Sequence, residues 1–268
     1  MNFEEKYLIY KPTKPDVEGD FSFSPSQFAK FIDKPWEFYR NVIQKLDVFE
    51  GNTASYIGTI VHGIAAAVAN GEEVDKEAIE RYVDSKEPSE DYDPDVVRSC
   101  YPEMAERLVN DYVLQSTPLG VEGRAAASVV KGYSVNGSYD RLEGTREDCC
   151  LVDYKTYSSS TKPKAIPKHY KYQLLCYAFA LRKMGYNVTR IRLVYVNRPI
   201  VGAMSPKTGK QFKSYPSEVT TLTEVLTEED LAYIESMLTL AIDSLEASKK
   251  YPELTHVIFH DNRIKEGK

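Results

Sequence analysis

The sequence lacks the features typical of a membrane protein, a secreted disulfide scaffold or a helicase. Its four cysteines form no C-x-x-C pair, so we expect reduced core thiols and neither a disulfide framework nor a cysteine-based metal site. No apolar run approaches the length of a membrane span, and the first residues do not resemble a signal peptide. The G-x-x-x-x-G-K-[ST] motif of nucleotide-driven motors is also absent. We therefore expect an intracellular, cytoplasmic protein with no membrane partner.

Acidic residues are missing from one long stretch. Residues 154–217 contain no Asp or Glu but thirteen Lys or Arg, although the whole chain has 40 acidic and 34 basic residues and a net charge of -6. The rest of the chain therefore has 21 basic residues against 40 acidic ones, a net charge of -19. This asymmetry predicts a basic surface on an acidic body, as expected of a protein that binds a phosphate backbone. The alternative is an ordinary solvated charged face.

Two runs within and before this stretch predict a β-hairpin with facing carboxylates. Residues 137–144 and 149–155 have the composition of strands and are joined by the polar turn 145–148. A symmetric hairpin places Asp140 opposite Asp153, and like charges that face each other across a ladder are destabilising. Asp153 and Lys155 share one face because strand side chains alternate.

Two carboxylates and an ammonium group on one patch fit a hard divalent cation with a bound phosphate. Mg²⁺ takes oxygen ligands, keeps several waters and accepts one or two carboxylates together with substrate phosphate oxygens. Such a metal polarises phosphorus and lowers the pKa of a bound water, and Lys155 could orient that water or offset negative charge. The alternative is a surface hairpin with ordinary charges, since Asp and Lys are common near turns.

Together with two flanking patterns, this hairpin resembles the PD-(D/E)XK nuclease superfamily, in particular its RecB-like and RecE-like exonuclease branch. The matching elements, in the family's order, are Gly58 to His62 (G-x-x-x-H), Gly137 to Asp140 (G-x-x-D), Asp153 to Lys155 (D-x-K) and Gln173 to Tyr177 (Q-x-x-x-Y). The resemblance covers roughly residues 20–200. It implies an α/β fold: a restriction-endonuclease-like core, in which helices flank a mixed central sheet, with a helical N-terminal elaboration.

The resemblance also implies roles for single residues. The implied ligands of Mg²⁺ or Mn²⁺ are His62, Asp140, Asp153 and the backbone carbonyl of Tyr154. Lys155 would position the attacking water, while Gln173 and Tyr177 would steady the site and contact the nucleic acid. Glu122 could be an additional acid, and an ordinary edge-strand Glu is an equal alternative. Family members with an iron-sulfur cluster place a cysteine where this chain has Lys34, so no such cluster is expected.

For two of these residues the local sequence also allows a purely structural role. His62 lies in a small-residue helix expected from about residue 59 to 70, where a lone His is usually a satisfied core residue. Tyr177 could be a packed core tyrosine beside a surface amide. It shares a helical face with Gln173, four residues earlier.

The loop and helix that follow the hairpin are candidates for DNA contacts. The lysines expected to bind DNA are Lys162, Lys164, Lys168 and Lys171. His169, Tyr170 and Tyr172 could stack on a base or sugar. A polar and basic loop here could follow a phosphate strand or gate the site.

The remaining elements complete the expected organisation. Residues 1–20 are expected to form an extended arm and residues 21–268 a single nuclease domain, consisting of a helical portion (21–118), a catalytic core (119–200) and a C-terminal loop and helix (201–268). Ser24 and Thr227 are expected to cap helices. The segment 202–215 is expected to be a basic hairpin or loop.

These observations favour a metal-dependent DNA exonuclease that hydrolyses phosphodiester bonds at duplex ends in recombination, repair or replication. By analogy with the family, the expected partners are duplex DNA, a ring of identical subunits and a single-strand annealing or recombinase protein. One alternative is a structure-specific or restriction-type endonuclease with the same catalytic centre. Another is a catalytically silent DNA-binding subunit, which would not need Asp140, Asp153 and Lys155 together.

Overall fold

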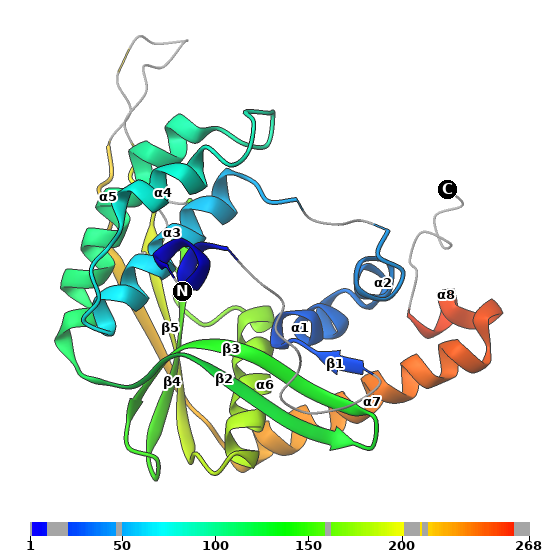
Figure 1. Ribbon diagram of the computed structural model, residues 1–268. Coiled ribbons are helices and arrows are strands. Elements are labelled where there is room, and N and C mark those ends of the chain that lie inside the picture. Colours follow the sequence, from blue (N-terminus) through cyan, green and yellow to red (C-terminus); the bar gives the residue numbers. More distant parts are fainter. Residues whose placement is uncertain are drawn as a thin grey trace.

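The computed structural model describes residues 2–9, 21–46, 50–158, 162–200, 210 and 214–259 (Figure 1). Within these residues one mixed sheet holds the strands β1 (Phe21–Phe23), β2 (Pro118–Val130), β3 (Tyr133–Gly144), β4 (Cys149–Tyr157), β5 (Val188–Asn197) and β6 (Val219–Val225). The helices are α1 (Pro25–Asp33), α2 (Pro35–Phe38), α3 (Thr53–Ala69), α4 (Lys76–Val83), α5 (Pro94–Asp111), α6 (Lys168–Lys183), α7 (Glu228–Lys250) and α8 (Thr255–Ile258). Helices cover both faces of the sheet, which confirms the expected α/β class.

Local sequence explains where the helices begin and end. Ser24 caps α1: the backbone N–H of Gln27 donates to the Ser24 hydroxyl, and the Gln27 side chain accepts from the Ser24 N–H. Thr227 and Asp230 form the same reciprocal cap at α7. Helix α6 ends just before Gly185, whose φ of 88° is the left-handed conformation that favours glycine.

The sheet is forked along one edge of β3. Strand β2 pairs antiparallel with nearly all of β3, so β1 and β4 must share the opposite edge. There β1 pairs in parallel with residues 133–135 and β4 pairs antiparallel with residues 141–144. Residues 136–140 lie between these two ladders with no strand partner on that edge in the described part of the chain. Beyond the fork, β5 pairs in parallel with β4 and antiparallel with β6.

Two hydrophobic clusters hold the helices against the two faces. On one face α1, α6 and α7 pack on side chains such as Leu151 and Leu193. On the other face α3, α4 and α5 pack on Val152 and Val194, the alternate residues of the same two strands. All four cysteines are buried and unbridged, as expected for core thiols. The site described below lies at the fork, between these two packed halves.

Several expectations need correction. Residues 4–8 are not part of an extended arm but form a helical turn, Glu4–Leu8, that buries Leu8 against α3. The expected helical portion opens with strand β1, and β6 was not expected at all, because both are short and lack a clear pattern. Residues 10–20 of the expected arm and most of the 202–215 segment lie outside the described residues. Among the helices that the structure describes, none has both the length and the apolarity to cross a bilayer.

Candidate active site at the fork of the sheet

The two aspartates lie where β3 and β4 separate. The hairpin has the expected register, with Arg141 opposite Val152 and Gly144 opposite Cys149, but the ladder ends one residue short of the aspartates. The N–H of Tyr154 instead donates to the Asp140 carboxylate, from backbone nitrogen to Oδ2 at 2.6 Å. The like charges predicted to face each other are therefore separated by a backbone donor.

His62, in helix α3, contacts the Asp140 carboxylate. Its Nδ1 lies 3.5 Å from Oδ2 of Asp140, and its ring stands edge-on to the Tyr154 ring at 5.8 Å. Burial alone would lower the pKa of His62, but the charge and hydrogen bond of Asp140 outweigh it and raise that pKa. Burial alone would raise the pKa of Asp140, but His62, Lys155 and the Tyr154 N–H hold it below its usual value.

Asp153 and Lys155 form a buried ion pair on the α6 face. The Lys155 Nζ lies 2.5 Å from Asp153 Oδ2, and Gln173 Nε2 donates to Asp153 Oδ1 at 3.4 Å. Burial, followed by repulsion from Asp140, raises the pKa of Asp153 to about 6 against the attraction of Lys155. Burial would lower the pKa of Lys155, but Asp153 and Asp140 outweigh it and raise that pKa. Lys155 is therefore held as a cation.

Glu122 lies on the other side of Asp140, in a strained backbone conformation. Its neighbours Val121 and Gly123 pair with Arg141 and Tyr139, which flank Asp140 in β3. Its φ of 47° is rare for a residue with a side chain and is typical of functional sites. Neighbouring protein atoms, followed by the charge of Asp140, raise its pKa, although the Glu122 side chain is exposed. Three adjacent strands thus each contribute one carboxyl group.

Tyr177 hydrogen-bonds the backbone of β3 where the fork leaves it without a strand partner. Its hydroxyl donates to the Ser138 carbonyl at 2.5 Å, on the unpaired part of β3. A Cβ at Gly137 would lie 2.7 Å from Pro25 Cδ and 3.0 Å from Tyr177 Cε1, so only glycine fits there. The G-x-x-D and Q-x-x-x-Y patterns are therefore in direct contact: Tyr177 of the second packs against Gly137 of the first.

The comparisons with known proteins agree with this architecture. The sequence model of the PD-(D/E)XK nuclease superfamily matches residues 22–253. The chain belongs to the PD-(D/E)XK nuclease superfamily. No curated relative matches this sequence.

The comparison with solved structures finds matches to this PD-(D/E)XK chain at low sequence identity. A candidate exonuclease from Eubacterium rectale has a TM-score of 0.51 and 13% identity, over 85% of this chain and 81% of that one. A phage-related exonuclease from Haemophilus somnus has a TM-score of 0.45 and 13% identity, over 93% and 97% of the two chains. An alkaline exonuclease from Laribacter hongkongensis has a TM-score of 0.34 and 15% identity, over 76% and 97%.

The donor types at the site fit the hard divalent cation that PD-(D/E)XK nucleases use. Carboxyl groups from three strands lie around the fork, and Mg²⁺ and Mn²⁺ favour carboxylate oxygens, whereas the imidazole of His62 is a less usual ligand for them. In the described ranges, however, no three His, Cys, Asp or Glu side chains are already oriented as a metal cage. In this structure Asp140 instead contacts His62, and Asp153 contacts Lys155 and Gln173.

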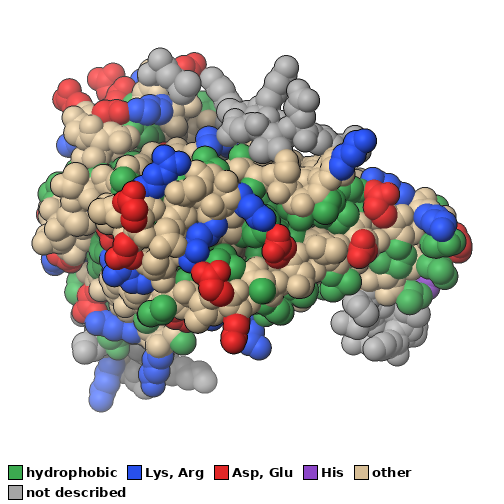
Figure 2. Space-filling view, turned by 90° about the horizontal axis from the view of Figure 1, so that it is seen from below, with side chains coloured by type: hydrophobic (Ala, Val, Ile, Leu, Met, Phe, Trp, Pro, Cys, Tyr) green, Lys and Arg blue, Asp and Glu red, His purple; other side chains and the backbone are tan. Residues whose placement is uncertain are grey.

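The lysines predicted to bind DNA fall into two groups. Lys162 pairs with Glu218 at 2.6 Å, and Lys171 pairs with Glu224 at 2.9 Å. Lys164 and Lys168 are exposed near the start of α6. On the face seen in Figure 2, blue and red side chains are interspersed rather than gathered into a basic area.

The expected basic surface is therefore smaller than the sequence predicts, because acidic residues outside residues 154–217 form ion pairs with its lysines and arginines in the folded protein. At least seven of its thirteen bases form ion pairs. Arg190 and Arg192, for example, pair with acids on the catalytic hairpin.

One polar residue of the site was not predicted from the sequence. Tyr195 of β5 lies opposite Lys155 in the parallel register of β4 and β5. The strand itself was expected, and its alternation puts Tyr195 on the face of Ile191 and Leu193. The register between β4 and β5, which brings Tyr195 beside Lys155, could not be predicted from the sequence.

Proposed function

We propose that this chain is a Mg²⁺- or Mn²⁺-dependent deoxyribonuclease that removes nucleotides from the ends of duplex DNA. The observation that carries the proposal is the convergence of Asp140, Asp153 and Lys155 at the fork, where β3 has no strand partner to cover them. A polar cluster of this kind, with raised and lowered pKa values side by side, is typical of an active site. The exonuclease names of the structural neighbours motivate the choice of DNA ends.

The residues that would hold the metal come from every element around the fork. They are His62, Glu122, Asp140, Asp153 and the Tyr154 carbonyl. When bound, the metal would polarise the scissile phosphate and lower the pKa of a water. Its charge would also offset the repulsion between the carboxyl groups that contributes to the raised pKa values of Asp153 and Glu122.

The chain's own side chains have separate tasks in hydrolysis. Lys155, held as a cation, would orient the attacking water and stabilise negative charge that develops on the phosphate. Gln173 fixes the Asp153 carboxylate, and Tyr177 fixes the strand that carries Asp140. Water adds to phosphorus as the bond to the 3′ oxygen breaks, which leaves a 5′ phosphate and a 3′ hydroxyl.

The test compares linear with closed circular duplex DNA, labelled separately at its 5′ and 3′ ends, in Mg²⁺, Mn²⁺ and EDTA. Metal-dependent loss of linear DNA alone is expected, and the label released first gives the polarity. Lys155→Ala should abolish cleavage, while Lys183→Ala, at an exposed ion pair with Glu235 at the far end of α6, should not. Cutting of the circle would favour an endonuclease. Binding without any cleavage would favour a silent DNA-binding subunit.

A further inference from the structure

Tyr195 places a hydroxyl group beside the catalytic ion pair. It lies opposite Lys155 in the β4–β5 ladder, one alternation beyond the Asp153–Leu193 pair. Side chains at these positions share the α6 face because strand residues alternate. Tyr195 is only 4% exposed, and its hydroxyl is buried.

Two buried polar atoms in this place lack a hydrogen-bond partner. One is the Tyr195 hydroxyl, and the other is Oδ2 of Asp153, which faces Lys155 Nζ as an ion pair but accepts no well-directed hydrogen bond. A buried polar atom without a partner is costly, and native proteins usually satisfy such atoms with protein groups or ordered water. One of these atoms is a donor and the other is an acceptor, so a single molecule between them could satisfy both.

Aromatic rings enclose this space. The Tyr170 ring centroid lies 5.1 Å from Lys155 Nζ and 6.2 Å from the Tyr195 ring, and the Tyr157 ring stands edge-on to Tyr195 at 5.5 Å. Burial, together with the charges of Tyr170 and Asp153, raises the pKa of Tyr195, which therefore stays a neutral donor. Two aromatic rings therefore flank Tyr195, and the Lys155–Asp153 ion pair lies on the same face of the sheet.

We propose that Tyr195 is a positioning residue that holds the attacking water against Lys155. The Tyr195 hydroxyl donates to the water, and the water donates to Asp153 Oδ2. The Lys155 ammonium stands beside the water as a charge. This arrangement gives the water the two or more polar partners that a buried water needs and leaves one lone pair free to reach phosphorus. The inference rests on the proposed function and adds a residue that the D-x-K motif does not contain.

Tyr195→Phe tests this role because it removes the hydroxyl and keeps the ring. We expect kcat to fall about tenfold, the loss of one hydrogen bond to the water, with KM for DNA unchanged. The melting temperature should not fall, since the variant removes a donor that lacks a protein partner. The matched control is Tyr157→Phe in the same ring cluster, whose hydroxyl is bonded to Thr220 instead. Its kcat should change less than twofold.

The outcomes separate this inference from the proposed function. An unchanged kcat in Tyr195→Phe, or a loss of kcat matched by a loss of melting temperature, would overturn the positioning role. A crystal structure of the wild type gives an independent readout: an ordered water between Tyr195 Oη and Asp153 Oδ2 supports it, and a direct protein partner for Tyr195 Oη overturns it. If the wild type cleaves no DNA in any metal, the proposed function fails, while the water site is still decided by the crystal structure.

Discussion

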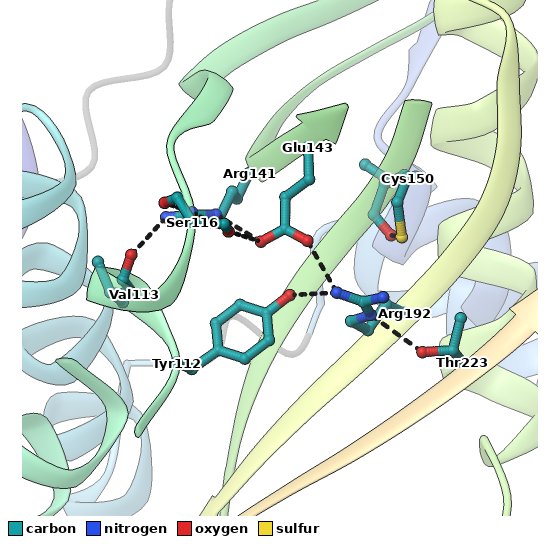
Figure 3. A network of polar contacts seen from close by, with 9 residues as sticks. Tyr112, Val113, Ser116, Arg141, Glu143, Cys150, Arg192 and Thr223 are labelled. Carbon is teal, nitrogen blue, oxygen red and sulfur yellow. Dashed lines mark hydrogen bonds and ion pairs between the residues drawn. The ribbon is translucent and has the colours of Figure 1, made fainter. Parts of the chain in front are cut away.

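The β3–β4 hairpin carries two polar clusters. They differ in how completely hydrogen bonds and ion pairs within the protein satisfy their charged groups. Towards the turn, the structural cluster of Arg141, Glu143, Arg192 and Tyr112 is closed (Figure 3). Arg141 and Arg192 both donate to the Glu143 carboxylate, at 2.9 and 2.8 Å, and Tyr112 joins Arg192 at 3.0 Å. One residue away, the fork cluster of Asp140, Asp153 and Glu122 is less completely satisfied, since the pKa values of Asp153 and Glu122 are raised and Asp153 Oδ2 accepts no well-directed hydrogen bond.

The difference follows from what each cluster must do. The structural cluster ties the end of α5 to the sheet, because Arg141 also donates to the carbonyls of Val113 and Ser116. Such a network stabilises a fold only when every member is satisfied. The fork cluster keeps three carboxyl groups close together, an arrangement that a cation would relieve. Tyr154 connects the two clusters: its N–H binds Asp140, and its ring stands edge-on to both His62 and Tyr112.

The largest effect on stability is expected where the structural cluster is broken. Arg141 is fully buried, so Arg141→Met removes one of the donors to Glu143 and the Arg141 donors to two carbonyls. We expect a loss of about 3–5 kcal/mol in the free energy of unfolding, measured by urea denaturation. Arg146→Ala, in the exposed turn of the same hairpin, should cost less than about 1 kcal/mol. Equal losses would show that the burial of Arg141 is not what matters.

A smaller effect of opposite sign is expected at Glu122. A side chain at φ 47° costs about 1–2 kcal/mol, and glycine adopts this conformation freely, at an entropic cost of about 0.5–1 kcal/mol. Glu122→Gly should therefore stabilise the fold by up to about 1 kcal/mol while it weakens metal-dependent cleavage. Ala126→Gly, at a regularly paired position of the same strand, should destabilise it. Destabilisation by both variants would mean that no strain is stored at Glu122.

The fork cluster should also make stability depend on pH. Folding raises the pKa of Asp153 from 3.8 to about 6, so the folded protein binds this proton more tightly than the unfolded chain does. Its contribution to stability is therefore present below about pH 4 and is lost as the pH rises to about 6. Asp140, whose pKa is lowered, acts in the opposite sense and loses its contribution in stronger acid. Unfolding measured across this range should show a decline in the wild type that is flatter in Asp153→Asn. Parallel curves would contradict the raised pKa.

The smallest effects are expected outside both clusters, at the lysines of α6 and its preceding loop. If Lys164 and Lys168 contact phosphates, Lys164→Ala and Lys168→Ala should each reduce the salt dependence of DNA binding by about one unit of slope. Lys171 already pairs with Glu224, so Lys171→Ala should change the slope less. Equal changes at all three positions would show that the ion pair of Lys171 opens on DNA.

The same contrast explains what could be predicted from the sequence. The turn of the hairpin fixes its own register, and alternation then places Asp153 and Lys155 on one face, so the fork cluster follows from local pattern and family resemblance. The structural cluster does not, because it joins residues from α5, β3 and β5 that only the tertiary fold brings together. For the same reason the basic stretch was misleading: Lys162 and Lys171 meet acids of β6 and its approach, which lie more than fifty residues away.

The most direct test of this account is a matched pair of substitutions on one strand, one in each cluster. We predict that Asp140→Asn lowers the free energy of unfolding by no more than about 1–2 kcal/mol, because Asn still accepts from the Tyr154 N–H and the lost attraction of His62 and Lys155 is partly offset by relief of the repulsion on Asp153. Cleavage should fall by about a thousandfold. Glu143→Gln should lose about 3 kcal/mol of stability and, where folded, retain its specific activity. A large loss of stability in Asp140→Asn, or a folded Glu143→Gln without activity, would contradict the division of the hairpin into a structural and a functional cluster.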